Sequence, residues 1–286
     1  MVPPLHATEC GAGSKTIVFL HGFGSCNETW RDVVAALGSG VRVLAYDLPG
    51  HGHSLGHQVA GAKSAARAIL ADLATRRLPK VHLVGHSMGG AVATLAALAD
   101  PERIATLTLL APGGFGPQIN GPLLRRYAAA ADTGEIRTCL AAMSGPRSVV
   151  PDHMVDALLR MRAQPGPSQT LIDMAAAMTK DERQGVISTE QLDSLRMPVM
   201  VIWGTEDTVL PVDQAQLIVQ TRVGRTRPEK QRRRCRDCRY QYPTERLHGS
   251  HFLGLMCHIK FLAADGRRRH GRSVACRRRP ECVVGA

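Results

Sequence analysis

The chain has 286 residues, which is enough for one α/β domain with a large insertion and a sizeable core. Its hydrophobic content of 44% is ordinary for a globular protein, and no stretch approaches the roughly 18 uninterrupted apolar residues that a membrane helix needs. The first residues contain no basic region followed by an apolar run. We therefore expect no secretory signal, no membrane association and a cytoplasmic location.

The net charge of +12 is concentrated at one end of the chain. Residues 1–221 contain 18 Lys and Arg against 19 Asp and Glu, whereas residues 222–286 contain 18 against 5. Five of the eight cysteines also lie in these last 65 residues. The basic character therefore belongs to a tail of different composition, and we expect no nucleic-acid partner for the protein.

Strand-like and helix-like segments alternate through the first 221 residues. Short apolar runs, rich in β-branched residues, predict parallel strands over 16–20, 41–46, 81–84, 104–110 and 199–203. Stretches rich in Ala and Leu predict helices over 64–76 and 90–99. This alternation is typical of the α/β class, with a doubly wound, mostly parallel sheet.

The alternation stops between residues 117 and 197. Helices are predicted there over 123–131, 135–143, 152–161 and 169–178. A single crossover needs only one helix, so we interpret 117–197 as a helical lid over the edge of the sheet where ligands bind in such folds; ordinary crossover helices are the alternative. Trimming Leu123, Leu158 or Met161 in such a lid is expected to change substrate preference more than stability.

These boundaries divide the chain into four parts. Residues 1–116 and 198–221 are the two parts of the core, 117–197 is the lid, and 222–286 is the basic tail.

The strongest chemical signal is the segment Gly85-His86-Ser87-Met88-Gly89. A serine hydroxyl becomes a good nucleophile when a sharp strand-to-helix turn exposes it and a neighbouring base takes its proton. Glycines two residues to either side remove side chains that would collide in that turn. An apolar strand precedes the segment and small residues follow it, so Ser87 is the candidate nucleophile.

Hydrolysis through Ser87 also requires donors for the developing oxyanion and an acid to orient the base. The amide of Met88 directly follows the nucleophile, and the amide of Phe23 lies between two glycines after the first strand. Asp207 follows the strand over 199–203 and is the candidate acid, with Glu206 as its local rival.

In order and spacing, these segments resemble the α/β-hydrolase superfamily, in its lid-bearing branch of esterases, lactonases and carbon–carbon hydrolases. Residues 115–120 also resemble a stretch of the hydrolase domains in acetoin dehydrogenase acyltransferase-like proteins. The resemblance implies that Ser87 is the nucleophile, Asp207 the acid, and Phe23 with Met88 the oxyanion hole. It also implies that His51 and His53 are structural, and that no metal or organic cofactor is needed.

The chain has no histidine at the position where the family's catalytic histidine is expected. His251, in the segment Leu247-His248-Gly249-Ser250-His251, best imitates the small-residue turn before the base, but it lies 44 residues beyond Asp207. Four interpretations of the tail remain open: a nucleic-acid-binding extension, a zinc site built on Cys235, Cys238, Cys257 and a histidine, a diverged but genuine tail, and a reading-frame slip near residue 221. The abrupt change of composition favours the slip.

The resulting hypothesis is a serine-dependent hydrolase that cleaves small-molecule carboxylic esters or lactones through an acyl-enzyme. A lactonase or carbon–carbon bond hydrolase would use the same triad. A catalytically silent protein of the same fold is expected if the tail supplies no base.

Overall fold

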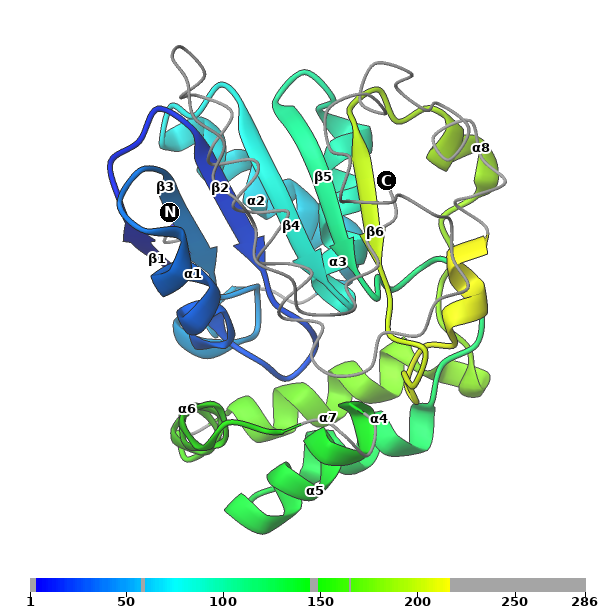
Figure 1. The fold of residues 1–286 in the computed structure, drawn as a ribbon. Helices are drawn as coiled ribbons and strands as arrows, with labels where there is room; N and C mark the ends of the chain where they lie inside the picture. Colours follow the sequence, from blue (N-terminus) through cyan, green and yellow to red (C-terminus); the bar gives the residue numbers. More distant parts are fainter. Residues whose placement is uncertain (1–3, 58–59, 145–148, 165, 217–286) are drawn as a thin grey trace, which may run out of the picture.

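The computed structural model describes residues 4–57, 60–144, 149–164 and 166–216. His251 and the basic tail therefore lie outside the described residues. Within the described ranges, six strands form one sheet in the order β1-β3-β2-β4-β5-β6 (Figure 1). The strands are β1 (Ala7–Cys10), β2 (Thr16–Leu20), β3 (Arg42–Tyr46), β4 (Val81–His86), β5 (Ile104–Leu110) and β6 (Val199–Ile202). Only β1 is antiparallel to its neighbour, so the expected α/β fold with a mostly parallel sheet is confirmed.

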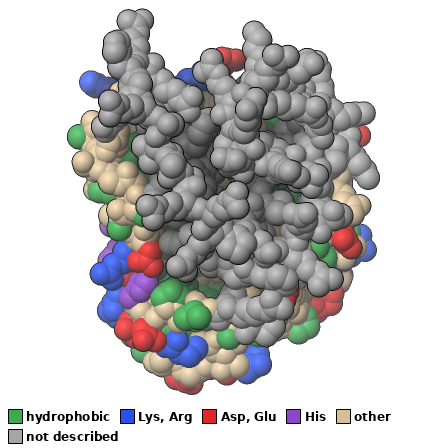
Figure 2. Space-filling model, in the orientation of Figure 1, with side chains coloured by type: hydrophobic (Ala, Val, Ile, Leu, Met, Phe, Trp, Pro, Cys, Tyr) green, Lys and Arg blue, Asp and Glu red, His purple; other side chains and the backbone are tan. Residues whose placement is uncertain are grey.

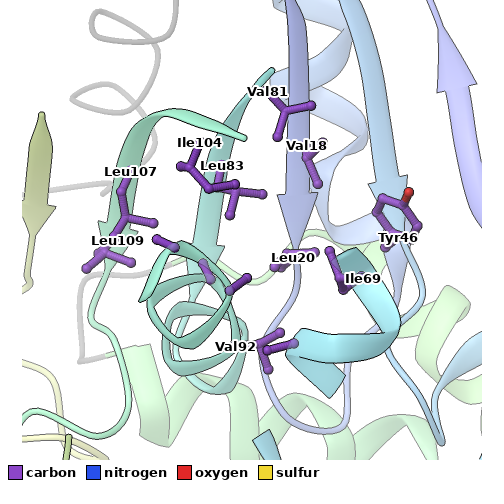
Figure 3. Close-up of a cluster of buried hydrophobic side chains, with 14 of the residues drawn as sticks. Val18, Leu20, Tyr46, Ile69, Val81, Leu83, Val92, Ile104, Leu107 and Leu109 are labelled. Atoms are coloured by element: carbon purple, nitrogen blue, oxygen red, sulfur yellow. The ribbon is translucent and has the colours of Figure 1, made fainter. Parts of the chain in front are cut away.

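The inner strands β2, β4 and β5 are largely apolar because both faces of the sheet are covered there. Successive residues point to opposite faces, and β2 shows this clearly: Val18 and Leu20 pack on one side, Ile17 and Phe19 on the other. Helices α2 (Ala62–Thr75) and α3 (Met88–Ala99) cover the first face, where Figure 3 shows Ile69 and Val92 against the strands. Helix α1 (Arg31–Leu37) packs on the second face through Val33.

Four further helices gather beyond the carboxyl ends of the strands, in the lower part of Figure 1. They are α4 (Gly121–Ala129), α5 (Thr133–Ser144), α6 (Asp152–Arg162) and α7 (Pro167–Met178). These helices share a hydrophobic core of their own, to which Phe23 and Cys26 from the loop after β2 also belong. We call α4–α7 the helical layer.

The helical layer leaves and rejoins the sheet at adjacent points. The backbone N–H of Gln184 donates to the Pro117 carbonyl over 3.0 Å, and Gln118 and Arg183 form an isolated bridge. The buried side chain of Gln214 donates to the Gln118 carbonyl over 2.7 Å. After this junction the chain packs with the sheet again, since the short helix α8 (Thr189–Asp193) contributes Leu192 to the main core.

Among the described residues, none of the helices is long and apolar enough to span a membrane. Acidic and basic side chains are interspersed at the bottom of Figure 2, which in this orientation is the helical layer. Ion pairs between them include Arg126 with Glu135 and Arg137 with Asp152. Arg160 of α6 also pairs with Glu28 of the short helix η1 (Asn27–Trp30), so it connects the helical layer to the segment after β2.

Candidate active site

Ser87 occupies a strained turn between β4 and α3. Its φ is +50°, in the left-handed region that a residue with a side chain rarely adopts. The turn is fixed through its backbone: the Ser87 N–H donates to the Leu110 carbonyl over 2.9 Å, and the Ser87 carbonyl accepts from Gly113 over 2.9 Å. Such strain, of about 1–3 kcal/mol, persists only where the surroundings impose it. Here β5 and the loop after it impose it.

The two glycines of the elbow are required by its backbone packing. A Cβ on Gly85 would lie 2.4 Å from the Gly89 carbonyl oxygen, and a Cβ on Gly89 would lie 2.3 Å from the carbonyl oxygen of Leu20. Both obstacles are backbone atoms, which cannot move aside as a flexible side chain would. The Gly-x-Ser-x-Gly spacing is therefore a steric requirement of this turn.

The loop after β2 lies directly against Ser87. A Cβ on Gly22 would be 3.3 Å from the Ser87 Cβ and 2.8 Å from the ring of His86. Phe23, the next residue, is buried within the core of the helical layer. The backbone N–H of Met88 is the first of α3, so it has no acceptor within the helix, and the helix dipole adds partial positive charge there. The structure thus brings the loop that carries Phe23 to the start of α3.

Two buried histidines brace this loop. The ring of His51 accepts from the Gly24 N–H at Nε2 over 3.0 Å, and its Nδ1 donates to the Pro49 carbonyl over 3.1 Å. His21 is bound in the same way, between the Leu48 N–H and the Gly22 carbonyl. Burial lowers the pKa of both rings, that of His51 to about 3, with the neighbouring His21 as a further cause. Both histidines are therefore neutral. Each ring accepts one backbone hydrogen bond and donates another, and these bonds fix the loop after β2 against the loop after β3.

The helical layer braces the same loop from the other side. The phenol of Tyr127, on α4, donates to the Gly24 carbonyl over 2.9 Å, and burial raises its pKa to about 12. Gly24 has a φ of +65°, and a Cβ there would lie 2.6 Å from the Tyr127 ring. The guanidinium of Arg162 lies 4.3 Å from the centroid of that ring and donates to the carbonyls of Tyr127 and Ala130. Local sequence patterns contain no signal for this contact, because Tyr127 is 103 residues from Gly24.

Asp207 lies in the loop after β6. Its Oδ1 accepts from the N–H groups of Val209 and Leu210, each over 2.9 Å. Asp207 is half-buried, whereas Glu206 is exposed, so the fold distinguishes the two neighbouring carboxylates. Since β4, β5 and β6 are parallel neighbours, the loops that carry Ser87 and Asp207 open at the same edge of the sheet.

Comparison with known proteins agrees with this architecture. The sequence profile of the alpha/beta hydrolase family matches residues 17–258, a range that includes Ser87, Asp207 and His251. The chain belongs to the alpha/beta hydrolase family.

The chain is similar in sequence to acetyltransferase components and to hydrolases. The acetyltransferase component of the acetoin cleaving system of Pseudomonas putida is 33% identical over 209 residues, which cover 72% of this chain and 55% of the relative. The chain thus spans about half the length of that relative. A 2-hydroxy-6-oxononadienedioate/2-hydroxy-6-oxononatrienedioate hydrolase of Cupriavidus pinatubonensis is 30% identical over 223 residues, 73% of this chain and 76% of the relative.

A solved structure shares the fold. The 2-hydroxy-6-oxo-6-phenylhexa-2,4-dienoate hydrolase of Rhodococcus superposes with a TM-score of 0.65, with 76% of this chain and 84% of that chain covered. The two sequences are 23% identical, so this similarity concerns the fold alone.

Proposed function

We propose that this protein is a serine-dependent hydrolase that cleaves small carboxylic esters through an acyl-enzyme intermediate. The observation that carries the proposal is the strained elbow, which places Ser87 at the amino end of α3 and against the loop of Phe23. Strain of this kind is retained where an exposed nucleophile requires it. We propose a small-molecule substrate, a cytoplasmic location, and no nucleic-acid or membrane partner.

In the first half-reaction, the Ser87 Oγ attacks the ester carbonyl while a base removes its proton. The amides of Phe23 and Met88 donate to the oxyanion of the tetrahedral intermediate, where preorganised donors contribute most to the rate. The intermediate collapses with loss of the alcohol, which leaves with the proton from the base. Ser87 then carries the acyl group.

In the second half-reaction, water gives a proton to the base and its oxygen attacks the acyl carbonyl. The carboxylic acid is released and the proton returns to Ser87. The proposed base is His251, oriented by Asp207, and it lies outside the described residues. If the tail supplies no histidine to the site, the fold remains and the chain is catalytically silent.

A carbon–carbon bond hydrolase or a lactonase is the second candidate. The relative from Cupriavidus pinatubonensis, whose name describes hydrolysis of a dienedioate, favours the carbon–carbon reaction. In that case the group that leaves the tetrahedral centre would be a carbanion equivalent rather than an alkoxide. The same nucleophile and oxyanion donors would be used.

The test is hydrolysis of p-nitrophenyl esters of increasing chain length, with lactones and a 2-hydroxy-6-oxo-dienoate alongside. Ser87→Ala should lower kcat by at least about a thousandfold with the fold retained, because removal of a triad nucleophile leaves only binding and oxyanion contributions. Ser194→Ala, an exposed serine at the end of α8, is the matched control. A Ser87→Ala variant that keeps more than about a tenth of the activity contradicts the mechanism, whereas turnover of the dienoate without ester turnover selects the second candidate.

A further inference from the structure

His6, Asp47 and His53 meet at the loop after β3, which also carries His51. His6 precedes β1, Asp47 follows β3, and His53 lies in the short helix η2 (Gly52–Ser54). Each offers one ligand atom, and these atoms all lie within 4.8 Å of one another. The two imidazole rings are 4.6 Å apart and tilted by 57°, so both rings lie beside the same carboxylate without stacking.

Asp47 is fully buried, and its position is fixed by the backbone. Its Oδ1 accepts from the Asn27 N–H over 2.7 Å, and its Oδ2 accepts from the His53 N–H over 3.0 Å. The carboxylate also lies against Gly52, where a Cβ would be 2.3 Å from it. The oxygens are therefore presented by a rigid loop.

This buried carboxylate has no Lys or Arg partner among the residues that the structure describes. Its ion-pair partner there is His6, whose Nδ1 lies 2.9 Å from Oδ2. A buried charge is costly unless a cation or a metal compensates it. The cluster reaches solvent through its histidines, since the His6 side chain is 39% exposed and His53 is exposed, while Asp47 lies buried behind them.

We propose that His6, Asp47 and His53 form a binding site for a zinc-type divalent ion. Two imidazole nitrogens and one carboxylate oxygen are a donor set that Zn²⁺ favours, with water as the fourth ligand. Tetrahedral zinc separates its N and O ligands by roughly 3.3 Å, so a small rotation of the His6 ring accommodates the ion. When the ion takes the nitrogen of His6 that faces Asp47, a neutral ring carries its proton on the other nitrogen.

The ion would join two segments that are distant in the sequence. It would tie the residues before β1 to the loop after β3, and that loop carries His51, which holds the Gly24 amide. The expected role is therefore structural, and it does not depend on the proposed hydrolase activity. A ligand that binds only the folded chain raises its stability.

The test titrates Zn²⁺ and Co²⁺ into the full chain, followed by calorimetry, thermal unfolding and the absorption spectrum of the cobalt form. His53→Ala removes one ligand but keeps the backbone hydrogen bond to Asp47, so it should fold normally and bind at least about tenfold more weakly. His6→Gln should act in the same way. His57→Ala, a nearby histidine outside the cluster, is the matched control and should bind like the unmodified chain.

The cysteines of the tail are the alternative ligands for the added metal. The absorption spectrum of the cobalt form distinguishes thiolate ligands from the His6, Asp47 and His53 site. Cobalt held by His6, Asp47 and His53 should show no thiolate-to-metal charge-transfer band, and Cys235→Ser with Cys238→Ser should leave its affinity unchanged. The proposal is overturned if zinc fails to raise the melting temperature, if His53→Ala binds as tightly as the unmodified chain, or if the cysteine variants abolish binding.

Discussion

At the scale of single residues, His21 and His51 link the active-site loop to the pH of the solution. Burial lowers the pKa of both rings, that of His51 from 6.5 to about 3. The unfolded chain therefore takes up protons below pH 6.5 that the folded chain does not bind. The stability that neutral His51 contributes is present above that pH and is lost as the pH falls towards 3, and neutral His21 acts in the same direction.

We expect the free energy of unfolding to decrease with falling pH, with each such proton contributing up to about 1.4 kcal/mol per pH unit. His51→Gln keeps an acceptor for the Gly24 N–H and removes one of the titrating groups. Its stability should depend less steeply on pH between 6 and 4, by about one proton. Urea unfolding followed by circular dichroism measures this difference, and parallel curves for the two proteins would contradict it.

The glycines of the elbow provide a second test at this scale. Gly89→Ala would place a Cβ 2.3 Å from the Leu20 carbonyl oxygen and 2.4 Å from that of His21. Because the obstacles are backbone atoms of the central strand and its loop, we expect a loss of about 3 kcal/mol or more. Gly56→Ala, whose Cβ would meet nothing within 4 Å, is the matched control. Equal melting temperatures for the two variants would show that the elbow can relax.

At the scale of the elements, the helical layer is coupled to the proposed oxyanion loop by the packing of Phe23 and by the hydrogen bond from Tyr127 to Gly24. Tyr127→Phe removes the donor to the buried Gly24 carbonyl. Since oxyanion contacts strengthen in the transition state, we expect kcat to fall about tenfold with little change in KM. Ester kinetics at saturating and limiting substrate separate the two effects.

Tyr46→Phe makes the same chemical change elsewhere. The Tyr46 phenol donates to Asp72 over 2.6 Å on the side of the sheet covered by α2. Its loss should cost about 1.5–3 kcal/mol of stability, as for a hydrogen bond to a charged group, and should leave kcat unchanged. If Tyr127→Phe behaves like Tyr46→Phe, then the contact with Gly24 is structural only.

The strands and helices that the sequence predicts are those with a strong local pattern. The runs over 16–20 and 104–110 coincide with β2 and β5 because buried parallel strands are continuously apolar. The antiparallel edge strand β1 is absent from the prediction, since its four residues are mostly exposed and form no apolar run. A pattern in one segment carries no information about pairing at an edge.

The sequence also does not show which side chains of the helical layer point into its core. Leu158, expected to influence substrate preference more than stability, is 1% exposed inside the core of the helical layer. Its truncation would open a cavity, at a cost of about 2–5 kcal/mol. The loop after β6 is similar, because spacing alone does not show that Asp207 is half-buried while Glu206 is exposed.

At the scale of the whole molecule, activity of this polypeptide depends on whether its tail supplies the catalytic histidine. If a reading-frame slip begins near residue 221, the protein made by the natural gene will differ in mass from the 30.8 kDa of this sequence. Intact mass spectrometry of that protein, with sequencing of the gene around codon 221, tests this directly. A matching mass, together with a His251→Ala variant that loses about a thousandfold in kcat as expected for a missing base, would refute the slip.

The junction at Gln118, Gln184 and Gln214 has an evolutionary consequence. The two ends of this insertion are hydrogen-bonded to each other. An insertion of this kind can change in length without moving the strands on either side, so it can be exchanged as a unit. Descendants of one scaffold could thus acquire new substrates by replacing residues 119–182, provided that the new segment again packs on Phe23 and holds the Gly24 carbonyl as Tyr127 does. Grafting the equivalent segment of a relative between these glutamines is a practical route to chimaeras with altered selectivity.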